Sequence, residues 1–75
     1  MPHRRGMLVK NVAEQSLSIR LKTRVLALEP GDERLVTPEE VRDAELREHL
    51  QVRSIAVVRP ATDEEGEALA RELRG

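Results

Sequence analysis

The stretch LALEPGDERLVTPEEV, residues 26 to 41, holds the signals that decide the fold of this chain. Leu26 and Leu28 alternate with other residues, which predicts the end of a strand on which both leucines share one face. Pro30 and Gly31 then predict a tight turn, because proline cannot donate to a β ladder and glycine accepts a positive φ. The pattern therefore indicates a strand that ends abruptly and reverses.

A helix start follows this turn after only a brief strand over residues 34–36. Thr37 is a typical N-cap, and Pro38 falls at the first helical position, where its missing N–H costs nothing. Glu40 stands three residues after Thr37 and completes a capping box. We interpret Pro30, Gly31, Thr37 and Glu40 as structural turn and cap residues.

The apolar residues of the helix that begins there do not share one face. On a regular helix Val41 and Ala44 point one way, whereas Leu46 and Leu50 lie more than a third of a turn round. A break near Asp43, whose side chain would cap a second piece, places both leucines on its inner face. The sequence predicts two short helical segments or one bent helix.

Other apolar runs predict further strands. Residues 7–10 form a short apolar stretch, residues 16–22 alternate cleanly, and residues 22–24 connect that strand to one over 25–28. Residues 52–59 form the last strand, with Ile55 and Val57 on one face and Val52, Ala56 and Val58 on the other. Because both faces are apolar, this strand is predicted to be central or to cover an interface.

The last segment predicts a weak helix. Pro60 stops the strand, and Thr62 with Glu65 forms a second capping box that opens a helix to about residue 73. Its apolar stripe is thin, with Leu69, Leu73 and some alanine. Such a helix is marginal alone and needs a surface on which to dock.

These elements indicate an α+β fold. We expect a small, mostly antiparallel sheet of three to five short strands, a broken helix before the last strand, and a C-terminal helix. The domain organisation is a basic N-terminal arm over 1–6, a small α+β domain over 7–59, and a C-terminal amphipathic helix over 60–75.

Composition argues against several classes of function. The 75 residues include no cysteine, so disulfides and thiolate metal sites are excluded, and the two histidines, His3 and His49, lack metal-ligand spacing. No aromatic residue is present to stack on single-stranded nucleic acid, and a net charge of −1 provides no basic field for a phosphate backbone. We expect no cofactor, no metal, no specific nucleic acid and no membrane partner.

Catalytic constellations are also hard to find. The paired carboxylates Glu39-Glu40 and Asp63-Glu64-Glu65 sit at predicted helix starts, where the helix dipole favours negative charge. His49 falls late in a helix, as a solvated or capping histidine would, and a general base would need a nucleophile beside it. We therefore predict that the chain is not an enzyme.

A small, wholly aliphatic core leaves oligomerisation or docking on a larger body as the remaining source of stability. The arm His3-Arg4-Arg5 carries forked donors for carboxylates of an adjacent subunit. The predicted interface residues are Arg4, Arg5, Ile55, Val57, Leu69 and Leu73.

The order VKNVAEQSLSIRL, then VLALEPGDERLVTPEEV, then ELREHLQVRSIAVV resembles small accessory structural proteins of tailed phages and phage-tail-like particles. The resemblance spans about residues 7–58. Asp32 stands where such proteins often have glutamate, and the segment from Pro60 has no counterpart. The resemblance implies a virion or tail role in a particle assembled in the bacterial cytoplasm. Its partners would be copies of the chain and other structural proteins.

Two alternatives from other classes stay open. The stretch LEPGDERLV is similar to part of the swapped-hairpin antitoxins and transition-state regulators, which are small dimeric DNA binders. In those proteins a helix precedes the stretch, whereas here a strand precedes it and the helix follows. A third possibility is a non-viral adaptor that adds a strand to a partner's sheet.

Overall fold

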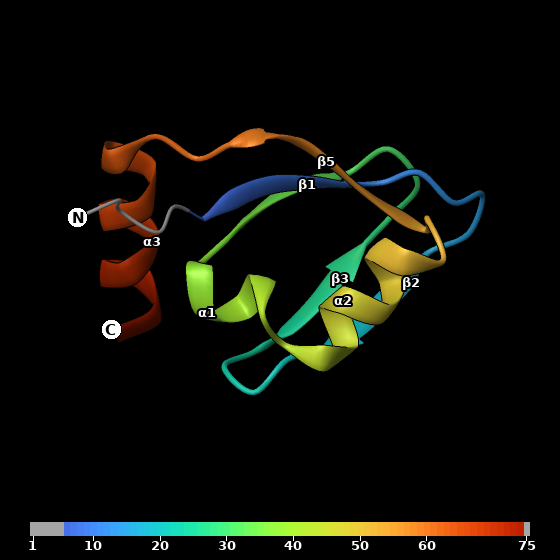
Figure 1. The fold of residues 1–75 in the computed structure, drawn as a ribbon, viewed down its shortest axis with the longest axis horizontal. Coiled ribbons are helices and arrows are strands. Elements are labelled where there is room, and N and C mark those ends of the chain that lie inside the picture. The colour runs from blue at the N-terminus through green and yellow to red at the C-terminus, as the bar shows by residue number, and fades with distance from the viewer. Residues whose placement is uncertain (1–5, 75) are drawn as a thin grey trace.

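The computed structural model describes residues 6–74 and shows five strands and three helices (Figure 1). In chain order they are β1 (Met7–Asn11), β2 (Leu17–Arg20), β3 (Val25–Leu28), β4 (Glu33–Val36), α1 (Pro38–Val41), α2 (Ala44–Gln51), β5 (Ile55–Pro60) and α3 (Asp63–Arg74). The predicted α+β class, the broken helix and the C-terminal helix are confirmed.

The strands form two antiparallel sheets. One sheet has the order β4-β1-β5, and the hairpin β2–β3 forms the other. In the hairpin Leu17 pairs with Leu28 and Ile19 with Leu26, so the predicted alternation puts these four side chains on one face. β1 lies at the centre of the larger sheet, although its sequence gave no sign of a central position.

The last strand starts later than predicted, and of its two predicted roles the central position is wrong. β5 begins at Ile55, and it is an edge strand, because β1 is its only neighbour in the three-stranded sheet. Val52 instead caps the end of α2, since the helix continues to Gln51 before the chain reverses. At this reversal Arg53 has a φ of 63°, and the N–H groups of Arg53 and Ser54 donate to carbonyls of the last turn of α2.

The helix breaks where the phase of its leucines predicted. Asp43 is the N-cap of α2 and accepts a hydrogen bond from the backbone N–H of Glu45 at 3.0 Å. This break turns Leu46 fully into the core, while Leu50 packs against it. At the end of α2, Nδ1 of His49 lies 2.9 Å from the hydroxyl of Ser54.

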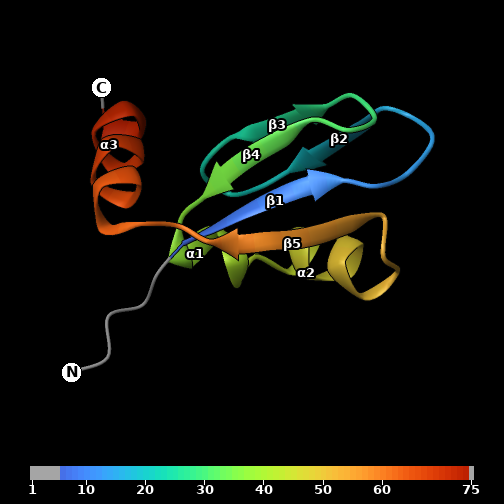
Figure 2. The ribbon, with the colours of Figure 1, turned by 90° about the horizontal axis from the view of Figure 1, so that it is seen from above.

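The core lies between the two sheets and α2. Its buried members are aliphatic: Val9, Ile19, Leu21, Leu26, Leu28, Val36, Leu46 and Ile55. Helices α1 and α2 and the hairpin all lie on one side of the strands β4-β1-β5, whereas α3 stands at one end of the sheet (Figures 1 and 2). One face of the three-stranded sheet is therefore left outside this core.

Candidate interaction surface

The face of the three-stranded sheet that points away from the core is the first candidate surface. Residues directly opposite each other in a sheet share a face, and Leu8 lies opposite Leu35 and Arg59. Lys10 in the same way lies opposite Glu33 and Ala56. We call these six residues the outer sheet face. Within residues 6–74, no helix or strand lies over its centre (Figure 2).

The outer sheet face carries three apolar and three charged side chains. Leu8, Leu35 and Ala56 are half-buried, and so is Lys10 on the central strand β1, whereas Glu33 and Arg59 on the edge strands are exposed. Such a mixture of apolar area and charged groups is compatible with a protein-protein interface. Two features in the sequence could have revealed it: Leu8 alternates with the core residue Val9, and Ala56 follows Ile55.

The face of β5 predicted to form an interface points the other way. Ile55 is 1% exposed and belongs to the chain's own core, so it cannot contact a partner. Val57 is 46% exposed and lies opposite Val9, next to a register shift in the pairing of β1 with β5. α2 packs against β5 and reaches past its free edge (Figure 2), which hinders the addition of another strand.

The predicted turn is bonded to Asn11, which the sequence analysis did not single out. Gly31 has a φ of 85°, as its position in the turn required, and its N–H donates to the carbonyl of Asn11. Asn11 is itself 1% exposed. Its side-chain amide donates to the carbonyl of Leu28 at 3.0 Å and to that of Gln15, and its side-chain oxygen accepts from Ala13 N–H.

Asn11 therefore ties β1, the following loop and the end of β3 together. The VKN and PGD segments on which the resemblance rests are joined here by hydrogen bonds, so both have a purely structural explanation. Asparagine after a strand is a common turn residue, and this was the available signal for its role.

Glu40 caps a helix and also binds two residues of the β2–β3 turn. Thr37 and Glu40 form the predicted capping box, with bonds of 2.9 and 3.1 Å. The Glu40 side chain is 1% exposed and also accepts from the Thr23 hydroxyl at 2.6 Å and from two nitrogens of Arg24 at 2.9 and 3.0 Å. Arg24 in turn donates to the carbonyl of Leu35. The group fastens the β2–β3 turn to α1 and β4.

The electrostatics of this group favour the charged carboxylate. Burial by itself raises the pKa of Glu40, but hydrogen bonds from Arg24, Thr23 and the Thr37 N–H, with the charge of Arg24, hold the pKa below its ordinary value. Local sequence patterns could not reveal the pair, because 16 positions separate the two residues. It is a structural ion pair whose donors and acceptors are used within the chain.

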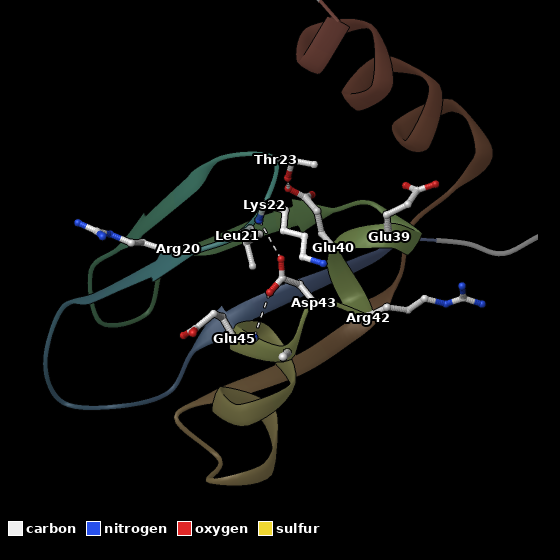
Figure 3. A pocket seen from close by; sticks show the side chains of 10 residues that line it. Arg20, Leu21, Lys22, Thr23, Glu39, Glu40, Arg42, Asp43 and Glu45 are labelled. Carbon is white, nitrogen blue, oxygen red and sulfur yellow. Dashed lines mark hydrogen bonds between the residues drawn. The ribbon is translucent and has the colours of Figure 1, made fainter.

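A hollow of about 700 Å³ lies beside this group, between the β2–β3 turn and the junction of α1 with α2 (Figure 3). Asp43 accepts there from the backbone N–H groups of Lys22 and Glu45, at 2.9 and 3.0 Å. Arg20 and Arg42 point away to opposite sides (Figure 3). The central carboxylates are thus engaged by the chain itself, and the charges around the hollow are of both signs.

The C-terminal helix docks on the body, as its thin stripe predicted. Leu69 is 6% exposed where α3 lies against β4, so in the single chain it is a buried residue rather than a free interface residue. Leu73, one turn further along, is 37% exposed. Thr62 and Glu65 form the second capping box, with bonds of 2.9 and 3.1 Å.

Two of the predicted interface residues, Arg4 and Arg5, lie outside the residues that the structure describes. Across residues 6–74, no group of three metal-ligating side chains is gathered, and no helix there is long and apolar enough to cross a membrane. The chain matches no known family, no curated protein and no solved structure.

Proposed function

We propose that the chain is a non-enzymatic structural or assembly subunit of a phage virion or phage-tail-like particle, acting through protein-protein contacts. The observation that carries the proposal is the outer sheet face, with its half-buried Leu8, Leu35 and Ala56 and the charged residues beside them. The resemblance of residues 7–58 to accessory phage proteins supplies the class of particle.

Physical chemistry supports the link between this face and assembly. A 75-residue domain with a small aliphatic core is only marginally stable. Covering apolar area contributes about 25 cal/mol per Å², so a neighbouring subunit on the outer sheet face would add stability that the single chain lacks. Arg4 and Arg5 would add forked contacts to carboxylates of that neighbour.

The test compares two alanines on exposed strand faces. Ala56→Arg places a charge on the outer sheet face, next to Lys10, and Ala27→Arg places the same charge on the exposed face of the hairpin, opposite Ser18. Each tagged variant is expressed in the bacterium that encodes the chain, and particles are separated by sedimentation. Circular dichroism of the purified variants checks that both fold.

We expect the wild type and Ala27→Arg to sediment with the particle, and Ala56→Arg to remain in the soluble fraction. Equal loss of both variants would remove the outer sheet face from the proposal. A wild-type chain that never sediments with a particle, and instead binds a defined duplex below micromolar concentration at physiological salt, would replace the proposal with the DNA-binding regulator.

A further inference from the structure

Two neighbouring strands of the outer sheet face, β1 and β4, carry an apolar row and a charged row side by side. Leu8 lies opposite Leu35, and Lys10 lies opposite Glu33. We call these four residues the β1–β4 patch. One row of the patch is made of two half-buried leucines, and the other row holds one positive and one negative side chain. No helix or strand of residues 6–74 covers the patch (Figure 2).

The two charges of this patch remain available to a partner. Lys10 and Glu33 lie on neighbouring strands, yet in the part of the chain that the structure describes neither joins an ion pair with another residue. Arg59, the third charged residue of the outer sheet face, donates both terminal nitrogens to Glu65, at 2.7 and 2.8 Å. Glu33 acts on Arg59 through its charge alone. Arg59 is thus used within the chain, whereas Lys10 and Glu33 are not.

The β1–β4 patch is complementary to itself under one two-fold rotation. An axis that runs parallel to the strands, midway between β1 and β4, places β1 of one copy over β4 of the other. Because this rotation leaves each row at the same height along the strands, Leu8 meets Leu35 of the second copy, and Lys10 meets Glu33 of the second copy. Both contacts then occur twice, as in every two-fold interface.

The other two-fold rotation in the plane of the contact does not fit. An axis that crosses the strands would exchange the two rows, so that both leucines of one copy would lie on Lys10 and Glu33 of the other. Burying charges against apolar groups without a partner is costly. The pattern of the patch therefore selects one arrangement, in which the strands of two stacked sheets are nearly aligned, as in β-sandwiches.

We propose that the outer sheet face binds a second copy of this chain, face to face, about the two-fold axis that is parallel to β1 and β4. Stacked sheets lie about 10 Å apart, and side chains from the two faces fill the space between them. The leucine rows contribute apolar area to the contact, and the two pairs of Lys10 with Glu33 fix its register and direction.

This assignment rests on the proposed function, which makes the outer sheet face a contact surface, and it commits that face to one occupant. The competing occupant is a different protein of the particle. Such a protein would present its own charges to Lys10 and Glu33, so reversing both signs between two copies of this chain would not restore its binding. The two occupants therefore give different results when charges are reversed in separate copies.

The test uses two charge-reversed variants, Lys10→Glu and Glu33→Lys. In a dimer of either variant alone, like charges face each other at both contacts. Mixing the two variants restores opposite charges at both contacts, and it does so only between copies, because within each variant the two positions carry the same sign. The matched control is Arg20→Glu, which changes the net charge as Lys10→Glu does but lies on the exposed face of the hairpin. Sedimentation velocity at low salt, over micromolar to millimolar protein, measures each dissociation constant, and circular dichroism checks that every variant folds.

We expect the wild type and Arg20→Glu to dimerise with similar dissociation constants. Each reversal alone should weaken the dimer by roughly tenfold or more, because like charges that face each other across an interface oppose association, and the equimolar mixture should return to about the wild-type affinity. A wild type that stays monomeric at millimolar concentration would overturn the second copy as occupant. A mixture that associates no better than its two components would also overturn it.

The outcomes separate this inference from the proposed function. A chain that is monomeric alone, yet sediments with the particle and loses this property in Ala56→Arg, would end the inference and leave the proposed function standing. A chain that dimerises and recovers in the mixture, yet never sediments with a particle, would support the contact between copies and end the proposed function.

Discussion

Gly31 and Arg53 both have a positive φ, of 85° and 63°, and each lies where the chain reverses direction. At Gly31 the reversal follows β3, and an added Cβ would meet nothing within 4 Å, so only the backbone conformation restricts the residue. At Arg53 the reversal follows α2, at the position where helices usually have glycine. The two sites therefore form a matched pair in which the same conformation is easy for one residue and strained for the other.

We predict opposite effects on stability when glycine is replaced at position 31 and introduced at position 53. Gly31→Ala should lower the free energy of unfolding by about 1 kcal/mol, because alanine must adopt a left-handed backbone. Arg53→Gly should raise it by up to about 1 kcal/mol, since strain is relieved but the unfolded chain gains freedom. Urea melts of both variants measure the changes. Effects of the same sign would contradict the assignment of strain to Arg53.

Glu40 and its neighbour Glu39 allow a test of the buried ion pair. Glu40→Gln keeps the shape but offers one acceptor oxygen to donors from Thr23, Arg24 and Thr37. We expect a loss of about 3 kcal/mol, the usual result of breaking a buried pair on one side. Glu39→Gln, on an exposed neighbour, should change the free energy of unfolding by less than about 0.5 kcal/mol. Similar urea midpoints for the two variants would show that the pair is of no consequence for stability.

Among the elements, those specified by neighbouring residues were predictable from the sequence. The turn at Gly31, the box of Thr37 with Glu40 and the break at Asp43 each depend on residues within a few positions. The position of β5 could not be predicted in this way, because the pairing of β1 with both β4 and β5 is set by contacts far apart in the chain. Ile55 was assigned to an interface for the same reason: alternation gives two faces but does not say which one meets α2.

Among the α3 side chains that the structure describes, Leu69 alone is buried. This small contact predicts that substitutions can change the stability of α3 without changing that of the sheet. Gly66 lies inside α3, and a Cβ added there meets nothing within 4 Å. Gly66→Ala should stabilise the helix by about 0.5–1 kcal/mol, and Thr62→Ala should destabilise it by about 1 kcal/mol through loss of the cap. Hydrogen exchange should show both effects in the amides of α3 and leave β1 unchanged. Equal changes in β1 would show that α3 and the body unfold as one unit.

For the whole molecule, the carboxylates with shifted pKa values all point to loss of stability in acid. Hydrogen bonds from Arg59 and from Thr62 N–H lower the pKa of Glu65 to about 2. Backbone N–H groups of Lys22 and Glu45 lower that of Asp43, and the pKa of Glu40 is lowered as well. These three groups connect α3 to β5, the hairpin turn to α2, and the same turn to α1. Protonation therefore weakens the joints between elements rather than the aliphatic core.

The direction of the pH effect follows from these shifts. A carboxylate whose pKa is lower in the folded state than its usual value near 4 contributes stability that is complete above about pH 5. That contribution is lost as the pH falls through the unfolded and then the folded pKa. We therefore expect the urea midpoint to be constant between about pH 6 and 8 and to fall steadily from about pH 5 to pH 2. Glu40→Gln should be less stable at pH 7 but should lose less between pH 7 and 3 than the wild type, because one of the titrating groups is gone. A midpoint that is the same at pH 7 and pH 3 in the wild type would mean that these carboxylates do not hold the elements together.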